Sequence, residues 1–479
     1  MHHLGRRSSD AIPEIRIGYI GGGSQGWAHT LINDLAQCTE IAGTVALYDV
    51  DYEAARKNAE LGTQVTDRAD ADGDWTFDAV RDLSAALSGA DIVICSIQDP
   101  PAETFVHDID LPKQYGIHQP VADTVGPGGI LRSMRAIPQY REIAATVREQ
   151  CPDAWVLNYT NPMTVCTRTL YEEFPEIKAI GLCHEVFQTQ ELFADLATTH
   201  LDGVDAVDSD EIHVTVKGIN HFAWIDEARW RGRDLYRFLD AELAARKPLA
   251  DFDPGSMTDA SYWVNNYRVA FDLYDRFGCF PAAGDRHLVE FVPWYLELDD
   301  PEALHRWGIR LTPSEARLPA DGPTPTERYL SGAETFEFTE SGEEAVDIIR
   351  ALLGLEPLET HLNYPNRGQV ANLPNGAVVE TNALLTGDAV TPLTAGSLPR
   401  PIRSLVLTHV HNQETLVEAG FDGDLDRAFR VFLSDPFVTL DRGAAESLFA
   451  ELVERERPYL DAWDGENATI LETGPDRRL

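Results

Sequence analysis

Two short stretches of this sequence could bind a metal ion, and both follow a stretch that could bind a dinucleotide. Cys183-His184-Glu185-Val186 and Gly218-Ile219-Asn220-His221 supply a thiol and an imidazole, which are common metal ligands. The earlier stretch, Gly21-Gly22-Gly23-Ser24-Gln25-Gly26, has the glycine spacing of a dinucleotide-binding loop. Together they predict an enzyme that uses a redox cofactor and a divalent cation on one substrate.

The residues around the glycine loop predict a nicotinamide cofactor. Residues 15–20 form a short apolar run typical of a buried strand, and residues 27–35 can form the helix whose N-terminus faces a pyrophosphate. A second predicted strand, 44–49, ends in Asp49, about where an acidic residue hydrogen-bonds the adenosine ribose of NAD. Asp49 therefore favours NAD over NADP. The residues that we expect to bind the cofactor are Gly21, Gly23, Gly26 and Asp49.

A lone cysteine and a lone histidine fit a buried thiol and a hydrogen-bonded ring at least as well as a metal site. Two further segments shift that balance. Asn158-Tyr159-Thr160-Asn161 places two amides just beyond a predicted strand, where they can bind sugar hydroxyls or the nicotinamide ribose. Asp123 precedes a glycine-rich turn at 126–129 that allows close approach of the backbone to a ligand.

The elements that must position these residues follow two patterns along the chain. Up to about residue 190, short apolar runs followed by polar residues alternate with helical segments, as in a parallel sheet with ligands at its carboxyl edge. From about residue 211 the pattern changes to alternating strands and longer connectors. The segments that we expect to be strands are 91–96, 155–159, 179–183 and 212–216, and the expected helices include 137–150, 261–277, 342–353 and 444–456.

These patterns predict an α/β protein. We expect a Rossmann-type doubly wound parallel sheet with a second α+β domain, similar to lactate and malate dehydrogenases. The boundary is placed near residue 200, with an NAD-binding domain at 1–200 and an α+β domain for substrate, metal and oligomerisation at 201–479.

The composition excludes several classes of partner. The chain has 479 residues, with 39 Lys and Arg against 79 Asp and Glu, for a formal net charge of −40. Such a surface repels nucleic acid and anionic membranes, so we expect neither as a partner. It is typical of proteins from salt-loving organisms or of an acidic, GC-rich bacterial proteome.

The cysteines and the apolar runs indicate a cytoplasmic protein. Six cysteines are scattered through predicted strands and helices without the rhythm of a disulfide framework, and reduced thiols are typical of the cytoplasm. The first twelve residues lack an apolar signal core, and no later apolar run is long enough to span a bilayer.

Taken together and in this order, the motifs resemble those of glycoside hydrolase family 4, the NAD- and manganese-dependent glycosidases. The resemblance covers nearly the whole chain. The segments that carry it are 21–26, 123–129 with Arg135 beyond it, 158–162, Cys183-His184, 218–221, 366–374 and Asp435-Pro436.

The resemblance implies a mechanism unlike ordinary glycoside hydrolysis. A hydride passes from carbon 3 of the sugar to NAD, and the resulting ketone acidifies the proton on carbon 2, which a base removes with help from Mn2+, or from Co2+ or Ni2+ in its place. The aglycone then leaves carbon 1, water adds, and the hydride returns. No net redox change results.

The resemblance also assigns roles to individual residues. Cys183 and His221 match the metal ligands, and His184 matches the acid that protonates the leaving oxygen, with a substrate-positioning histidine as an equal alternative. For the base, Asp285 comes first and Tyr267 second; the alternative for Asp285 is a structural pair with its neighbour Arg286. His287 is expected to line the pocket.

The substrate class follows from the residues after the cysteine. Cys183-His184-Glu185-Val186 resembles the α-galacturonidase branch of the family, whose substrates are pectic oligogalacturonides. A uronate carboxylate requires a guanidinium, which Arg286 or Arg135 could provide. The residues that we expect to bind substrate are Asp123, Arg135, Asn158, Asn161, Asn220 and Arg286.

Other functions remain open from the sequence. An α-galactosidase or α-glucosidase of the same family would share every motif except the glutamate after His184. A lactate- or malate-type NAD-dependent dehydrogenase would explain the glycine loop but not Cys183, and an NAD-binding protein without catalysis would ignore manganese. We expect a homodimer or homotetramer.

Overall fold

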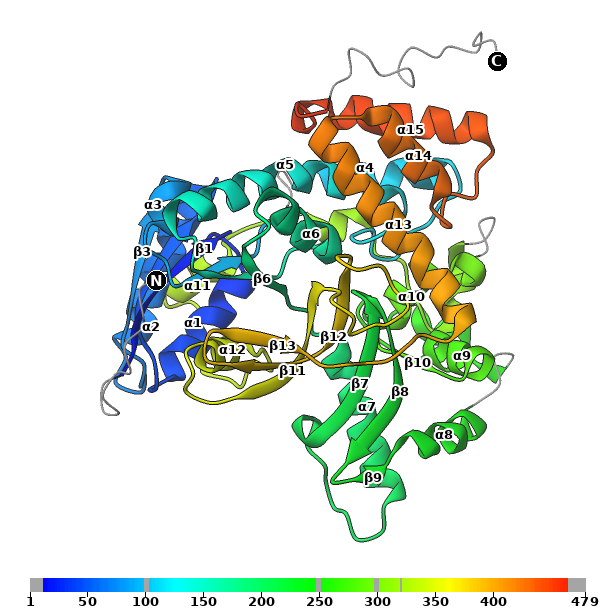
Figure 1. The fold of residues 1–479 in the computed structure, drawn as a ribbon, viewed down its shortest axis with the longest axis horizontal. Helices are drawn as coiled ribbons and strands as arrows, with labels where there is room; N and C mark the ends of the chain where they lie inside the picture. Colours follow the sequence, from blue (N-terminus) through cyan, green and yellow to red (C-terminus); the bar gives the residue numbers. More distant parts are fainter. Residues whose placement is uncertain (1–11, 99–102, 247–250, 297–300, 319–320, 464–479) are drawn as a thin grey trace.

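The computed structural model describes residues 12–98, 103–246, 251–296, 301–318 and 321–463 (Figure 1). The strands are β1 (Glu14–Ile20), β2 (Ala42–Tyr48), β3 (Trp75–Val80), β4 (Ile92–Cys95), β5 (Trp155–Asn158), β6 (Lys178–Gly181), β7 (Ile212–Ile219), β8 (Phe222–Trp230), β9 (Arg233–Asp234), β10 (Phe280–Pro281), β11 (Leu358–Pro365), β12 (Val378–Thr386) and β13 (Ala389–Pro392).

The α-helices are α1 (Trp27–Gln37), α2 (Tyr52–Thr66), α3 (Leu83–Leu87), α4 (Glu103–Gln114), α5 (Gly126–Gln150), α6 (Met163–Glu173), α7 (Glu185–His200), α8 (Leu239–Ala245), α9 (Arg268–Phe277), α10 (Asp285–Phe291), α11 (Pro325–Leu330), α12 (Ala345–Leu352), α13 (Arg400–Asp422), α14 (Leu425–Ser434) and α15 (Arg442–Glu456). Short 3-10 helices lie at Ser209–Glu211, Tyr236–Phe238, Pro254–Met257, Pro293–Tyr295, Pro301–Trp307, Ser314–Arg317 and Arg457–Tyr459. No helix in the described ranges combines the length and apolar character needed to cross a bilayer.

The N-terminal half is a doubly wound parallel sheet, as predicted. Its strands lie in the order β3-β2-β1-β4-β5-β6 and pair in parallel, which is the strand order of dinucleotide-binding domains. All four residues of β4 and of β5 are buried, because helices cover both faces of the sheet. Helix α1 packs on one face through Ala28, Leu31, Ile32 and Leu35, spaced as one stripe of a helix, while α5 and α6 cover the other face.

The same sheet continues into the C-terminal half. An antiparallel contact between Asn363 of β11 and Gly181 of β6 joins the halves, and β12, β7, β8 and β10 extend the sheet beyond it. The described strands therefore form one 13-stranded sheet that runs past the predicted boundary near residue 200. Helix α13 packs on α5 and α6, and α14 and α15 contact α5, as the orange and red ribbons of Figure 1 show. The two-domain division stays a prediction.

Helices α5 and α9 begin farthest from where the sequence indicates. We expected a turn at 126–129 and a helix from residue 137, but α5 begins at Gly126 and contains Pro138 in its interior. Gly126 has a φ of +68° and Pro127 follows in the first turn, where its missing N–H costs no hydrogen bond, so the predicted turn is the start of the helix. Helix α9 begins later than expected, at Arg268.

Arg135 of α5 lies in a buried ion-pair network. Its guanidinium contacts Oδ2 of Asp108 on α4 at 2.6 Å and Oε2 of Glu456 at the end of α15 at 3.2 Å. The Arg135 side chain is 1% exposed, and both carboxylates are fully buried. His107 of α4 closes the network, with its Nδ1 2.6 Å from Oε1 of Glu456. The network fastens α15 to α4 and α5.

We expect Arg135→Ala to destabilise the protein by about 3–5 kcal/mol, because it leaves the carboxylates of Asp108 and Glu456 buried without their guanidinium. Chemical unfolding monitored by circular dichroism measures the change. Arg56→Ala is the matched control: Arg56 pairs with Glu53 and Glu60 on the exposed face of α2, and its loss should change the unfolding midpoint little. Similar midpoints for both variants would show that the buried network contributes no stability.

Candidate active site

Two adjoining cavities lie at the carboxyl edge of the parallel strands. The larger, about 790 Å³, is lined by the glycine loop after β1 and by residues that follow β2, β4 and β5. The smaller, about 320 Å³, is lined by residues around Cys183, His221 and α10. Trp27, Tyr159 and Asn161 line both cavities, so the two cavities share a wall.

The larger cavity fits a dinucleotide. Gly21 has a φ of +91°, and a Cβ at this position would lie 2.0 Å from the carbonyl oxygen of Ser96, so only glycine fits the turn. The turn leads into α1, whose first N–H groups have no side-chain cap and line up as an anion-binding site. Asp49 follows β2, and its Oδ2 accepts the N–H of Gly23 at 2.9 Å. The structure thus places Gly21, Gly23, Gly26 and Asp49 along one cavity.

The smaller cavity contains a cluster that could hold a metal ion. Asp123 precedes α5, His221 lies in the turn between β7 and β8 with a φ of +61°, and His287 lies on α10. One donor atom from each lies within 4.8 Å of the other two. Oδ1 of Asp123 is 3.9 Å from Nδ1 of His221 and 3.9 Å from Nδ1 of His287.

The electrostatics of this cluster suit a cation. Burial alone would raise the pKa of Asp123, but His287, His221 and Arg132 together hold it well below its usual range. Burial, followed by the charge of His287, lowers the pKa of His221 to about 3. At neutral pH the carboxylate is therefore ionised and the imidazole of His221 neutral, which are the forms that bind metals.

Cys183 follows β6 and lines the same cavity as His221, although it is not part of the cluster formed by Asp123, His221 and His287. Burial, reinforced by Glu380 and Glu185, raises the pKa of the Cys183 thiol well above its usual value. Without a cation the group is a neutral thiol; a bound cation would displace its proton. Asp123 and His287 join this pair as possible ligands. The sequence assigned them to substrate and pocket, because no short spacing connects residues 123, 221 and 287.

Two buried glutamates hold the cluster in place. Oε1 of Glu290 accepts hydrogen bonds from the N–H groups of Val121 and Ala122 at 2.6 and 2.9 Å. These bonds hold the loop that ends in Asp123 against α10. Glu185 accepts the N–H of Gly284 at 2.5 Å, and its Oε1 lies 3.7 Å from Nε2 of His287. The sequence did not predict a role for Glu290, because this residue acts through hydrogen bonds to a loop 168 to 169 residues earlier in the chain.

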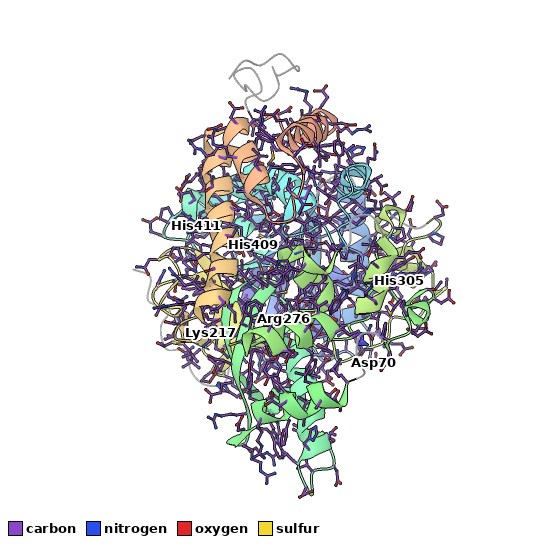
Figure 2. All side chains as sticks on the ribbon, turned by 90° about the vertical axis from the view of Figure 1, so that its right-hand side faces the viewer. Asp70, Lys217, Arg276, His305, His409 and His411 are labelled. Carbon is purple, nitrogen blue, oxygen red and sulfur yellow. The ribbon has the colours of Figure 1, made fainter. Side chains whose placement is uncertain are left out.

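Helix α10 is in turn supported by α13. His409 of α13 is buried and donates from Nε2 to the carbonyl oxygen of Phe291 at 3.2 Å, and its ring packs against Phe222 and Phe291. Figure 2 labels His409 and His411 along this helix.

The three candidates for acid and base differ in their surroundings. His184 lines the cavity and is 46% exposed, with one ring nitrogen 4.0 Å from Glu185 and the other 3.9 Å from Glu343. Asp285 lines the cavity too, but its carboxylate accepts the N–H groups of Arg268 and Ala270 at 2.6 and 2.9 Å and so caps α9. Burial raises the pKa of Asp285 to about 6.

Tyr267, the second candidate for the base, lies outside the residues that line the cavity. It precedes α9 with a φ of +53°, and its hydroxyl donates to the carbonyl oxygen of Gln188 at 2.9 Å. Burial, reinforced by nearby carboxylates, raises its pKa above the usual value. Because Tyr267 does not line the cavity and Asp285 does, the structure favours Asp285 as the base.

The predicted substrate-binding residues divide into two groups. Arg286 and Asn161 line the smaller cavity together with Asp123; Nδ2 of Asn161 lies 3.5 Å from Oδ2 of Asp123. Asn158 is instead fully buried beneath it, where its Oδ1 accepts the hydroxyl of Tyr140 at 2.5 Å. Asn220 is also fully buried, and Arg135 lies in its ion-pair network away from both cavities. The sequence placed these three at the edge because it cannot show which way a side chain points.

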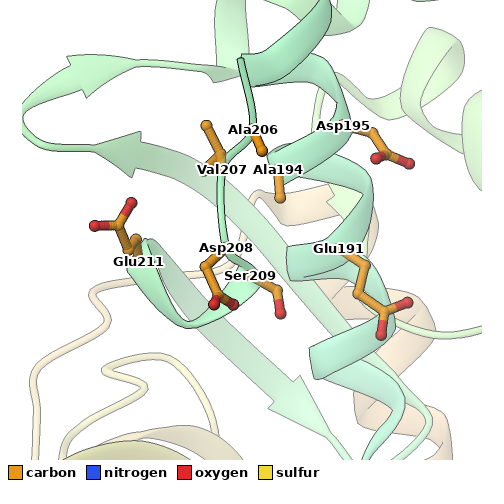
Figure 3. Close-up of a pocket in the computed structure, with 8 residues that line it drawn as sticks. All are labelled: Glu191, Ala194, Asp195, Ala206, Val207, Asp208, Ser209 and Glu211. Atoms are coloured by element: carbon orange, nitrogen blue, oxygen red, sulfur yellow. The ribbon is translucent and has the colours of Figure 1, made fainter. Parts of the chain in front are cut away.

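A third cavity, of about 590 Å³, lies between α7 and the loop before β7 (Figure 3). Its polar lining consists of Glu191, Asp195, Asp208, Ser209 and Glu211. None of its lining residues is among those predicted to act in catalysis or binding. It is an acidic, solvated face of a strongly acidic chain.

The fold and the site define the class of protein: an α/β protein with the doubly wound sheet of nucleotide-binding enzymes and a second, polar cavity beside the nucleotide site. A lactate dehydrogenase from a deep-sea metagenome library shares this fold, with a TM-score of 0.50 at 12% identity, over 85% of this chain and 98% of that chain. This likeness concerns the fold alone.

The chain belongs to glycosyl hydrolase family 4. Residues 16–199 match the family model described as family 4 glycosyl hydrolase, and residues 216–438 match that of the family 4 glycosyl hydrolase C-terminal domain. The protein is therefore a glycosidase, and the family assignment favours this over the dehydrogenase alternative.

Relatives of known structure or activity span nearly the whole chain. The chain is 46% identical over 466 residues to the alpha-galacturonidase of Thermoanaerobacterium saccharolyticum, covering 96% of this chain and 99% of the relative. The crystal structure of lplD from Bacillus subtilis has a TM-score of 0.82 at 45% identity, over 92% of this chain and 100% of that one. The 6-phospho-beta glucosidase of Thermotoga maritima, solved with manganese, NAD+ and glucose-6-phosphate, has a TM-score of 0.73 at 21% identity, over 93% of this chain and 99% of that one.

We expect the metal-free protein to lose stability on acidification, in part through His221. Its pKa is about 3 in the folded protein and 6.5 ordinarily, so between these values the unfolded chain binds a proton that the folded protein does not. The free energy of unfolding should then fall by up to about 1.4 kcal/mol per pH unit as the pH drops through this window. Urea unfolding in a chelating buffer at several pH values measures the slope.

His221→Asn should make this slope shallower, since asparagine tolerates the left-handed backbone and does not titrate. His361 of β11 is a matched control, because burial lowers its pKa to about 3 as well and it lies outside the cavity. His361→Asn should flatten the slope without changing Mn2+ binding. A His221→Asn slope equal to that of the unmodified protein would contradict the buried, neutral imidazole.

Proposed function

We propose that this glycosidase is an NAD- and Mn2+-dependent α-galacturonidase that acts on pectic oligogalacturonides. The observation that carries the proposal is the wall of Trp27, Tyr159 and Asn161 shared by the two cavities. It would bring a nicotinamide in the larger cavity against a sugar held over Asp123, His221 and His287 in the smaller one. The name of the relative that is 46% identical over 96% of the chain supports the substrate class.

The residues present fit both cofactors. Gly21, Gly23 and Gly26 line the larger cavity with Asp49, and the uncapped N-terminus of α1 would receive the pyrophosphate. Cys183 and His221 would hold Mn2+, or Co2+ or Ni2+ in its place. When bound, the nicotinamide would accept and return a hydride, and the cation would stabilise negative charge beside the oxidised carbon.

Asp123 and His287 would add a carboxylate and a second imidazole to the ligands of the cation. Manganese prefers oxygen donors to thiolate, so Asp123 improves the fit of the site to that metal.

Proton transfers would fall to side chains at the cavity wall. His184 is 46% exposed and could deliver a proton to the oxygen of a leaving group that points to solvent. Of the two candidates for the base, we propose Asp285. A pKa of about 6 suits proton abstraction near neutral pH, although the carboxylate would have to exchange one of its helix-capping hydrogen bonds for the substrate proton.

Arg286 would recognise the uronate. It is the predicted arginine that lines the cavity, and its guanidinium is oriented by bonds to the carbonyl oxygen of Pro120 and the hydroxyl of Thr312. A planar guanidinium matches a carboxylate in a fork geometry. Asn161 and Asp123 line the same cavity and would bind hydroxyl groups of the sugar. Glu185, from the galacturonidase-like motif, holds the loop before Arg286 through Gly284.

We also propose that the enzyme works in the cytoplasm as a homodimer or homotetramer. All six cysteines are free, which agrees with a reducing compartment.

Turnover in deuterated water should place deuterium on carbon 2 of the released sugar, because the proposed elimination removes the proton at that carbon and solvent replaces it. Mass spectrometry of galacturonate released from digalacturonate, with NAD+ and Mn2+ present, measures the label. Cys183→Ser should abolish both turnover and exchange while NAD+ affinity stays unchanged, since the thiol lies outside the dinucleotide cavity. Release of sugar that retains its carbon 2 hydrogen would exclude the mechanism.

The unmodified enzyme should prefer galacturonides to galactosides by about a thousandfold, since a uronate offers the Arg286 guanidinium a carboxylate to bind and a neutral sugar does not. Arg286→Gln should reduce that preference by lowering kcat/KM for the uronide while sparing the residual cleavage of the galactoside. Arg56→Gln is the control, because Arg56 lies on the exposed face of α2 outside the cavity and its loss should leave the activity on both substrates unchanged. A native enzyme that prefers neutral or phosphorylated glycosides would refute the uronidase assignment and leave the family assignment intact.

A further inference from the structure

We infer that Trp263 is the platform on which the leaving sugar residue stacks. This inference rests on the proposed function and names the residue that binds the part of the substrate beyond the scissile bond. Trp263 lines the smaller cavity, yet 66% of its surface is exposed. It is among the most exposed of the large apolar side chains in the described part of the chain.

The cavity has a buried end and an exposed end. His221 is 3% exposed and Asp123 9%, whereas Trp263 and His184 on the same cavity wall reach solvent. In the proposed mechanism, oxidation and proton abstraction occur on the galacturonate whose carbon 1 carries the scissile bond. Carbons 2 and 3 of that sugar must therefore lie at the buried end of the cavity, beside His221 and Asp123. The leaving residue is joined through carbon 1 and must then extend towards the exposed end, where Trp263 lies.

Trp263 is held in position before any substrate binds. The guanidinium of Arg286 lies 4.6 Å from the centroid of the Trp263 ring and packs on one face of the indole. The segment before α9 is anchored by the Asn266 amide, which donates to the carbonyl oxygen of Gly308 at 2.8 Å, and by Arg310, which donates to that of Ala260 at 2.8 Å. A side chain that is already ordered costs less entropy when a ligand binds.

The chemistry of the indole suits a sugar at this position. One face of a pyranose presents C–H groups, which pack on a flat aromatic surface and displace water from it. A galacturonate at this subsite also carries a charge that a chain of net charge −40 repels, and Arg286 behind the indole supplies a compensating positive charge. One arginine and one tryptophan would thus serve the two sugars on either side of the scissile bond.

The test compares two substrates that differ only in the leaving group: digalacturonate, whose leaving group is a sugar, and methyl α-galacturonide, whose leaving group is too small to stack. Trp263→Ala should lower kcat/KM for digalacturonate by about tenfold or more and change that for the methyl glycoside by less than about twofold. Trp263→Phe should restore most of the loss. Digalacturonate, but not galacturonate, should quench the fluorescence of Trp263 in enzyme without NAD+.

Trp294→Ala is the matched control. Trp294 is 55% exposed, stacks on Phe277 and does not line the cavity, so its loss should leave both substrates unaffected. An equal loss on both substrates in Trp263→Ala would show that Trp263 acts through Arg286 or the cavity wall, and no loss on either would show that it binds no sugar. Both results overturn the inference.

The role of Trp263 can be tested even if the proposed substrate class is wrong. If the native enzyme cleaves neutral galactosides instead, the uronidase assignment fails, and the same comparison between melibiose and methyl α-galactoside decides the role of Trp263.

Discussion

The site depends on one buried carboxylate, Asp123, lying between two imidazoles. Burial opposes its ionisation, and the surrounding basic groups, His287 first and Arg132 with it, overcome that opposition, so the carboxylate stays charged in a place where a lone carboxylate would take up a proton. The three residues come from the loop before α5, the β7–β8 turn and α10. Each imidazole has Asp123 as a neighbour at 3.9 Å, and a divalent cation would satisfy all three at once.

The surrounding structure can be understood as support for that cluster. Glu290 ties α10 to the loop that carries Asp123, Glu185 ties the Cys183 segment to the loop before α10, and His409 ties α10 to α13. Each bond joins segments far apart in the chain through a buried polar group. Such groups are costly to leave without partners, so they specify one arrangement of the helices around the cavity.

The continuous sheet gives the two cavities their fixed relationship. Nucleotide-binding folds place ligands beyond the carboxyl ends of their parallel strands, and here the second half of the chain extends the same sheet and closes over that edge. The cavity at the glycine loop and the cavity that contains Asp123, His221 and His287 therefore adjoin each other and share side chains such as Trp27 and Tyr159. The proposed mechanism needs this arrangement, since the sugar would have to contact both cofactors in one orientation.

The sequence by itself determined the doubly wound sheet and the glycine loop, and it singled out Asp49 as well as Cys183, His221 and Arg286, which line one cavity in the structure. These depend on local patterns: apolar runs of strand length, glycines at a turn, and polar residues just after strands. Only the tertiary structure decided that Asp123 and His287 complete the cluster, that Glu290 positions it, that Arg135 and Asn158 lie elsewhere, and that Asp285 caps α9. Those outcomes depend on side-chain direction and on contacts between separate elements, such as the bond from Ala122 to Glu290, which lie 168 residues apart. Local pattern cannot encode them, because the same residue type satisfies the pattern whether it faces a cavity or an ion pair.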